Sequence, residues 1–289
     1  MVKLYTDTDT DLTLEEANRY GYKMISMPYI VDGKEVYPYV DFEKFDYTDF
    51  YNQLRKGTMP TTCAISPTQY IEYFEEEFKN GHDILYVHFS AAMSGTFNAM
   101  NIAYEELQEK YPERKLYTID TKGITILSNI IVKEIGDMYL AGKSVEEIMK
   151  WAEEEVDHFA TYFFADELKF FKRSGRISNF SATMGSLIGV KPIIYMDANG
   201  QMTNIGKERG RNNAIRKLVS YVEELGVDIQ KHRIIVGHSD ALNLAQKLAD
   251  QLKEKFGENL NIEFVVVNPT AGSHCGPDTV GVAFYAKHK

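Results

Sequence analysis

The chain has 289 residues, of which 44% are hydrophobic and 26% charged, and its formal net charge is −10. These values are ordinary for a globular protein, and the length allows one large domain or two of medium size. The acidic balance argues against a general binder of nucleic acid or of anionic membranes, because phosphate-rich partners favour a basic surface.

The cysteine content is low and carries no recognisable pattern. Cys63 and Cys275 form neither a metal-binding spacing nor a disulfide framework. This favours a reducing compartment, and we expect a cytoplasmic protein. The N-terminal stretch has no apolar run of the length that a signal peptide or a membrane span needs, so no integral membrane segment is expected.

The first half of the chain alternates strands with helices. Apolar runs predict strands at 3–6, 24–31, 84–89 and 116–120. Helices are predicted at 45–54, 124–140 and 145–156. Another helix begins at a cap at Ser66 or Thr68 and ends at Lys79, and a further helix includes residues 101–107. This alternation indicates a parallel sheet, and we expect a Rossmann-like α/β domain over residues 1–157.

The second half has a different pattern. Strands are predicted at 160–165, 191–196, 202–207, 233–238, 262–268 and 280–285, with a hairpin turn at Asn199-Gly200. Helices are predicted at 168–174, 182–187, 212–225 and 241–256. Mixed helices with a hairpin favour an α+β domain over residues 158–289, which makes the chain a two-domain α/β protein.

Polar side chains follow several of the predicted strands of the first half. Each of them alone is most simply a helix cap. Together they are more suggestive, because ligands bind outside the carboxyl ends of the strands in open α/β sheets. Hydroxyls and helix N-terminal N–H groups there can cradle an anion. The residues are Asp7 and Thr8, Thr61 and Thr62, residues 90–96, and Asp120 and Thr121.

The turn Ser94-Gly95-Thr96 could also hold a nucleophile. It does not match G-x-S-x-G, since Ala92-Met93 precede the serine. A hydrolase would further need a base and an orienting acid. The histidines that could serve as the base are His88, His238 and His274.

His274 lies in a glycine-rich stretch, residues 270–278, that we predict to be a loop. Flanking glycines allow close approach of the backbone to a ligand, so His274 is either a binding or catalytic residue or a satisfied structural one. No second histidine or cysteine stands at ligand spacing, and no metal is expected.

Two basic clusters stand out in an acidic chain. Such clusters are usually solvated surfaces, but they could also contact phosphates or an acidic partner. The first contains Lys169, Lys172, Arg173 and Arg176, and the second contains Lys207, Arg209 and Arg211.

On these segments the chain resembles the DegV family, the fatty-acid-binding subunits of bacterial fatty acid kinase. The resemblance extends over almost the whole chain and rests on the order and spacing of its motifs. They are YTDTDTDL, TTCAISP, HFSAAMSGTFNA, TIDTK, LKFFKRSGRIS, GVKPII, KERGRNNA, GHSD and GSHCGPDTVGVAFY.

The resemblance implies two domains with a long-chain fatty acid between them. Thr62 and Ser94 would hold its carboxylate, with Gly95 and Thr96 completing the turn. His274 would lie near the head group, where it or Arg176 could assist chemistry. The chain departs from the family pattern at Cys63, Ala64 and Asp278, which replace a serine, a glutamine and the glycine of Gly-Pro-Gly, and at Thr8, which replaces a serine.

The resemblance also implies a lipid carrier without cofactor or ATP site, which presents the fatty acid to a separate ATP-dependent kinase subunit. The chain indeed lacks a G-x-x-x-x-G-K-[ST] motif. A stand-alone acyl or phosphoryl transferase or hydrolase using Ser94 and His274 is the alternative, and a lipid sensor is a third. Residues that could line an apolar tunnel or belong to the ordinary core are Met24, Ile25, Met27, Phe163, Phe164, Phe170, Phe171, Met184, Leu187 and Ile188.

Overall fold

The computed structural model describes residues 1–178 and 189–289. The helix expected at 182–187 and the tunnel candidates Met184, Leu187 and Ile188 lie outside the described residues. The first half contains β1 (Val2–Asp7), η1 (Thr8–Thr10), α1 (Leu14–Tyr20), β2 (Tyr22–Ile25), β3 (Tyr29–Val31), β4 (Lys34–Val36), α2 (Tyr47–Arg55), β5 (Thr61–Thr62), α3 (Pro67–Lys79), β6 (Asp83–His88), η2 (Ala91–Met93), α4 (Thr96–Lys110), β7 (Leu116–Asp120), α5 (Ile126–Leu140), α6 (Val145–Glu155) and η3 (Val156–His158).

The second half continues with a run of strands and helices in less regular order. Its elements are β8 (Phe159–Phe164), α7 (Leu168–Ser174), β9 (Ile177–Ser178), β10 (Val190–Met196), β11 (Met202–Arg209), α8 (Arg211–Leu225), β12 (Arg233–His238), α9 (Leu242–Phe256), β13 (Asn261–Val266), α10 (Pro269–Cys275) and β14 (Val280–Tyr285).

The expected parallel sheet of the first half is confirmed. Its strand order is β2-β1-β6-β7, and all three pairings are parallel. The single strand predicted at 24–31 is wrong, because β2 ends at Ile25 and β3 belongs to another sheet. Between them the Met27 amide donates to Thr8 Oγ1 at 2.9 Å instead of to a neighbouring strand, and Pro28 has no N–H to donate.

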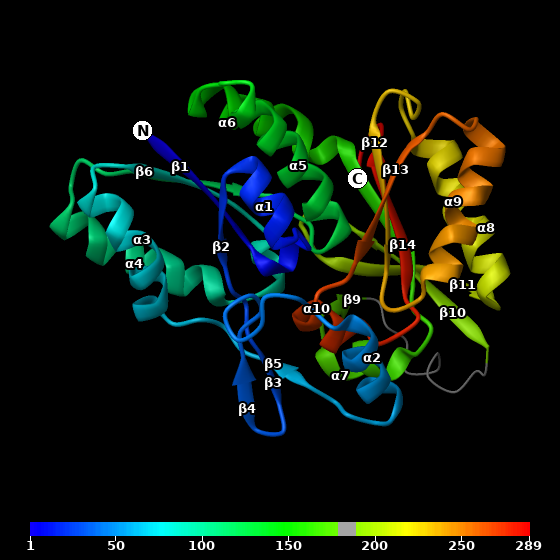
Figure 1. Cartoon of the computed structure of the whole chain (residues 1–289). Coiled ribbons are helices and arrows are strands. Elements are labelled where there is room, and N and C mark those ends of the chain that lie inside the picture. Colours follow the sequence, from blue (N-terminus) through cyan, green and yellow to red (C-terminus); the bar gives the residue numbers. More distant parts are fainter. Residues whose placement is uncertain (179–188) are drawn as a thin grey trace.

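The second half forms a mixed sheet of seven strands in the order β13-β12-β14-β8-β10-β11-β9. Helices α8 and α9 cover one face and α5 the other (Figure 1). Side chains alternate accordingly along β12, since successive residues of a strand point to opposite faces. Val236 joins the core under α8 and α9, whereas Ile235 joins the core around α5. The α+β character of this half is thereby confirmed.

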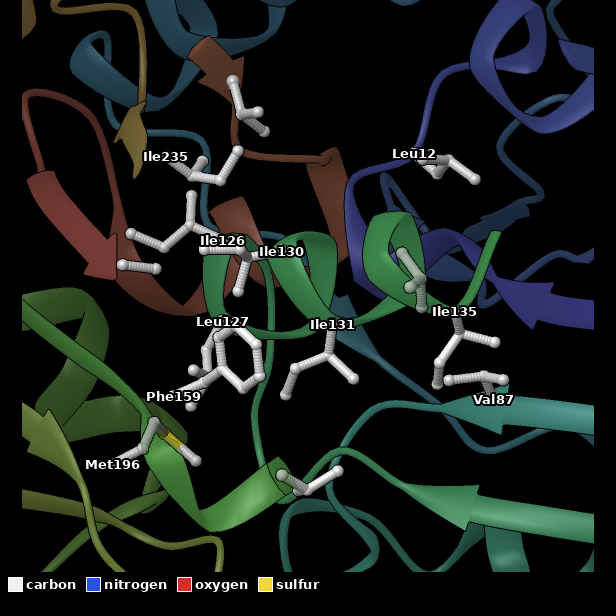
Figure 2. Packing of buried hydrophobic residues seen from close by; sticks show 14 of the residues in the cluster. Leu12, Val87, Ile126, Leu127, Ile130, Ile131, Ile135, Phe159, Met196 and Ile235 are labelled. Atoms are coloured by element: carbon white, nitrogen blue, oxygen red, sulfur yellow. The ribbon is translucent and has the colours of Figure 1, made fainter. Parts of the chain in front are cut away.

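Helix α5 lies between the two large sheets. Its residues 126–133 are all buried, and most of them are apolar. Its side chains pack with Val87 of the parallel sheet and with Ile235 and Met196 of the mixed sheet (Figure 2). The parallel sheet ends before residue 121 and the mixed sheet begins at Phe159. The domain boundary between residues 157 and 158 stays a prediction, because α5 belongs to the core beneath both sheets.

A small antiparallel sheet, β4-β3-β5, completes the fold below the parallel sheet (Figure 1). We expected only a loop at 58–67, but Thr61 and Thr62 pair with Ile30 and Tyr29 as β5. This pairing fixes the backbone position of Thr62.

Candidate functional site

A largely apolar cavity lies between the parallel sheet, α5, α10 and the mixed sheet. It holds about 1170 Å³ of free space counted out to its mouth. Three of the tunnel candidates, Met27, Phe163 and Phe171, line it, whereas Met24, Ile25, Phe164 and Phe170 do not. Other apolar side chains on its wall are Phe89, Met196 and Met202. Its largely apolar wall, with a few polar side chains, is the kind of lining that suits an apolar ligand with a polar end.

Ser94 and Gly95 stand on the cavity wall where α4 begins. Ser94 Oγ accepts a hydrogen bond of 3.2 Å from the Thr96 amide, which turns the chain into the helix. Gly95 is the N-cap residue and has no side chain to block the approach to the first turn. The positive end of the α4 dipole and the Ser94 hydroxyl therefore favour an anion here.

Thr96, the third residue of the turn, is placed differently. Its side chain is fully buried and its Oγ1 lies 3.2 Å from the Tyr70 hydroxyl. It is not part of the cavity wall. The structure thus brings Ser94 and Gly95 to the candidate site but not the Thr96 hydroxyl.

Thr62 reaches the cavity from β5, and its Oγ1 lies 2.9 Å from Nε2 of His274. The stretch before β5 is held by Arg173, whose guanidinium donates to the Met59 carbonyl at 2.6 Å and also to that of Pro60. Arg173 thus holds the segment before β5 in place through hydrogen bonds to its backbone carbonyls. Arg176 lies on the cavity wall itself, where it is an exposed cation.

His274 lies on the cavity wall, but our prediction of a loop there is wrong. Residues Pro269–Cys275 form α10, which is capped by Asn268. The glycines serve packing and not the approach of a ligand. A Cβ at Gly272 would come 2.5 Å from the Tyr51 hydroxyl, and one at Gly276 would come 2.2 Å from the Phe170 ring. They allow α10 to lie close to α2 and α7.

Burial lowers the pKa of His274 to about 4, and the charges of Arg176 and Arg173 add to this effect. The imidazole is therefore neutral at pH 7, with one nitrogen that donates and one that accepts. His88 and His238 are buried away from the cavity wall, with hydrogen bonds to Phe89 and Ala241. Of the three histidines considered, the structure brings only His274 to the site.

Most other polar strand ends have structural roles. Asp7 Oδ2 accepts from the Tyr86 hydroxyl at 3.0 Å and from the Phe89 amide at 3.2 Å. Thr121 donates to the His88 carbonyl at 2.9 Å, and Ser90 to the Gly200 carbonyl at 2.8 Å. These are long-range tertiary contacts; the expected caps are formed separately, by the Asp9 amide donating to Asp7 Oδ1 at 3.0 Å and the Ala92 amide donating to Ser90 Oγ at 3.3 Å.

Both cysteines line the cavity. Burial raises the pKa of Cys275 to about 12, and burial together with Glu35 raises that of Cys63, so both thiols stay protonated.

Within residues 1–178 and 189–289, no group of His, Cys, Asp or Glu side chains is arranged to hold a metal ion. No helix in the same ranges combines the length and apolar character that crossing a membrane requires.

Asp278 lies outside the cavity wall. Its φ of 61° is in the left-handed region that favours glycine, which explains the glycine expected at this position. Its carboxylate pairs with Arg55 at 2.9 Å and with Arg211 at 3.3 Å. Arg211, from the second basic cluster, also binds Asp166 at 2.8 Å. Asp278 thus ties α2 to the start of α8.

Among the polar residues of the cavity wall, the sequence analysis did not single out Asp9, Thr125, Thr161 and Thr279. Asp9 follows β1 in the run TDTDTD, where it looks like one more turn residue. Thr125 immediately precedes α5. The alternating acids were the available signal, but the sequence does not say which of them faces a cavity.

These features define an α/β protein in which two sheets enclose an apolar cavity with hydroxyls on its wall. Residues 1–287 match the family described as "Uncharacterised protein, DegV family". The chain is 34% identical over 287 residues to the DegV domain-containing protein CPE0026 of Clostridium perfringens, covering 99% of this chain and 98% of that protein. The chain therefore belongs to the DegV family.

Two solved structures share the fold over nearly the whole chain. A protein of Eubacterium ventriosum described as stearic acid-binding superposes with a TM-score of 0.86 at 20% identity, with 99% of each chain covered. A DegV family protein of Eubacterium eligens, described as loaded with heptadecanoic acid, gives 0.85 at 22% identity, with 99% of this chain and 100% of that chain covered.

Proposed function

We propose that this protein binds one long-chain fatty acid in the cavity and presents its carboxylate to a separate ATP-dependent kinase subunit, which forms the acyl phosphate. The observation that carries the proposal is the pairing of an apolar cavity with the Ser94 turn and the Thr62–His274 contact on its wall. Two proteins of the same fold are described as binding saturated fatty acids, which supports it.

The acyl chain would supply the affinity. A palmitate-sized chain has about fourteen methylenes, and their burial at roughly 0.8 kcal/mol each gives a gross gain on the order of 10 kcal/mol. The costs of association and ordering reduce this gain considerably. The head group is then free to set orientation, and it need not be held by a buried ion pair.

The head group would be held by hydroxyls. With a neutral His274, an Nε2–H that donates to Thr62 Oγ1 leaves the Thr62 O–H free to donate to the carboxylate. Ser94 and the start of α4 would supply the second contact. Arg176, on the same cavity wall, would offset the charge of the carboxylate and of the phosphoryl group that reaches it.

In this proposal the predicted domain of residues 1–157 supplies Thr62 and Ser94, and that of residues 158–289 supplies His274 and Arg176. The protein acts in the cytoplasm as a carrier, and the kinase supplies ATP chemistry. The stand-alone enzyme with a Ser94–His274 pair is less well supported, because the hydroxyl within hydrogen-bond distance of His274 Nε2 is that of Thr62.

The binding step is tested with delipidated protein and palmitate, by displacement of a fluorescent fatty acid. We expect saturable one-to-one binding, and a loss of about 100-fold or more in the Ser94→Ala/Thr62→Val variant, since two hydrogen bonds to a charged group are removed. Thr118→Val/Ser220→Ala, with hydroxyls outside the cavity wall, is the matched control. No binding of palmitate by the wild type would refute the proposal.

The presentation step needs a second assay. The loaded protein is mixed with a fatty acid kinase subunit, ATP and Mg²⁺, and acyl phosphate is trapped with hydroxylamine. Acyl hydroxamate formed only when both proteins are present supports the proposal. Turnover by this chain alone would favour the stand-alone enzyme, and tight binding without turnover in the mixture would reduce the role to a lipid sensor.

A further inference from the structure

Methionine is the commonest bulky apolar residue on the cavity wall. Among the described residues that line the cavity there are four methionines, three phenylalanines, two isoleucines, one valine and no leucine. Leucine is one of the commonest residues in globular proteins, so the preference for methionine calls for a reason other than apolar character. We call these four residues the methionine wall: Met27, Met93, Met196 and Met202.

The backbone of the methionine wall is held in place by hydrogen bonds. Met196 and Met202 are paired in register in the β10–β11 hairpin. The Met27 amide donates to Thr8 Oγ1 at 2.9 Å, and the Met27 carbonyl accepts from Thr270 Oγ1 at 2.7 Å. At these positions any change in the shape of the wall must therefore come from the side chains.

The methionine side chain is suited to such changes. It is unbranched, has three rotatable bonds and a polarisable sulfur, and therefore fits surfaces of irregular shape. Isoleucine and valine, by contrast, are stiff at χ1 because they branch at Cβ. Proteins that bind partners of varied shape use methionine-rich surfaces that can repack. The methionine wall can thus change its shape while its backbone stays in place.

Another part of the cavity wall is closely packed. Ile126, which is labelled in Figure 2, fits against two strand glycines on the same wall. A Cβ at Gly237 would come 2.2 Å from Ile126 Cγ2, and one at Gly281 would come 2.7 Å from Phe163 Cβ and 3.1 Å from Ile126 Cδ1. Ile126 and Phe163 have no space to move toward these strands, so the methionine wall is the adaptable part of the lining.

We propose that the methionine wall adapts to the shape of the acyl chain, so that straight saturated and bent cis-unsaturated fatty acids both belong to the ligands of this cavity. The two kinds of chain are alike in their apolar surface and differ mainly in shape. A wall that changes its shape can bury either chain to a similar extent, and the buried apolar area sets the affinity. The inference rests on the proposed function, since it names the class of fatty acids that the same cavity takes.

The test compares three acids with equal numbers of carbon atoms: saturated stearic acid, cis-unsaturated oleic acid and its straight trans isomer, elaidic acid. Displacement of a fluorescent fatty acid from the delipidated full chain gives the three dissociation constants. For the wild type we expect the three values to agree within about fivefold. A larger difference between stearic and oleic acid would overturn the inference, because the cavity would then select one shape.

The Met196→Ile/Met202→Ile variant makes part of the methionine wall stiff, with side chains that suit β-strands. We expect the ratio of the dissociation constants for oleic and stearic acid to change by about fivefold or more, because a fixed wall fits only one of the two shapes. Met138→Ile/Met149→Ile is the matched control, since these methionines pack against the core but lie outside the cavity wall. A smaller change in the wall variant, like that expected of the control, would overturn the inference.

Methionine methyl groups labelled with ¹³C test the wild-type protein directly, even where the double variant does not fold. We expect the NMR signals of the methionine wall to differ between the stearic and oleic acid complexes, and those of Met138 and Met149 to coincide. Identical wall signals in the two complexes would overturn the inference, because the wall would then keep one shape. If none of the three acids binds, the proposed function itself is contradicted, so the two failures are distinguishable.

Discussion

Thr62 Oγ1 and His274 Nε2 lie 2.9 Å apart although 212 residues separate them in the sequence. This contact joins β5 to α10 on the cavity wall, and in the proposed function it orients the Thr62 hydroxyl toward the carboxylate. Thr62→Val keeps the shape of the side chain and removes the hydroxyl. We expect the dissociation constant for palmitate to rise about 10-fold, as for one lost hydrogen bond to a charged group.

The control for this substitution is Thr118→Val on β7, outside the cavity wall. Fluorescence displacement reports both variants under the same conditions. Equal affinities for Thr62→Val and the wild type would show that the Thr62 hydroxyl does not contact the carboxylate.

The pKa of His274 gives the protein an acid-sensitive component of stability. Burial, with the charges of Arg176 and Arg173, lowers this pKa to about 4, against about 6.5 in the unfolded chain. The unfolded chain therefore binds more protons between these values, and stability is lost as the pH falls from about 6.5 to about 4. The contribution of His274 to the free energy of unfolding is fully present above that pH range.

Urea unfolding of the wild type and of His274→Gln, measured from pH 7 to pH 4, checks this. We expect the free energy of unfolding to fall by about 2–3 kcal/mol more for the wild type than for the variant over this pH range, because glutamine does not titrate. Parallel curves would mean that His274 is protonated as easily in the folded protein as in the unfolded one.

Lys133 connects three elements of the core. Its side chain is 1% exposed, and its Nζ lies 2.7 Å from Glu16 of α1 and 2.8 Å from Glu263 of β13. Lys133→Met leaves both carboxylates without this partner, so we expect the free energy of unfolding to fall by about 2–3 kcal/mol. This is less than the full cost of an unpaired buried charge, because both carboxylates are partly exposed.

Lys143→Met is the matched control, since the pair of Lys143 with Glu147 on α6 is solvent-exposed and contributes little. Chemical denaturation measures both variants. A similar small loss in the two would show that the Lys133 contacts are no stronger than a surface pair.

Asp278→Gly restores the residue that the family pattern has at this position. The change removes ion pairs to Arg55 and Arg211 but relieves a φ of 61°, so we expect the free energy of unfolding to stay within about 1 kcal/mol. Palmitate affinity should stay within about twofold, because Asp278 is not on the cavity wall. A large loss of affinity would mean that the Arg55–Asp278–Arg211 link controls the cavity.

The sequence predicted the long elements well and the short ones poorly. Strands β7, β12 and β14 have the predicted bounds, because each is a compact apolar run between polar ends. The two-residue strands β5 and β9 have no such run. For α10, the glycines flanking His274 suggested a loop, although the helix start was present in Asn268-Pro269, where Asn268 Oδ1 accepts from the Ala271 amide at 2.9 Å.

The candidate site was predictable only in part. Ser94 follows β6 of the parallel sheet, where ligands of α/β sheets bind, and the family resemblance selected it and Thr62 among many hydroxyls. The partner of His274 depends on how α10 packs on β5, which no local pattern encodes. The position of Asp9 on the cavity wall likewise depends on the packing of η1 against α5.

The most direct test of the account is the ligand that the protein carries when it is purified from its host. The protein is denatured, extracted with organic solvent and analysed by mass spectrometry, together with the Ser94→Ala/Thr62→Val variant. We expect about one fatty acid of about 14 to 18 carbons per wild-type chain and a strongly reduced amount in the variant. A clean extract, with no uptake when fatty acid is offered, would contradict the proposal that this cavity is a fatty-acid site.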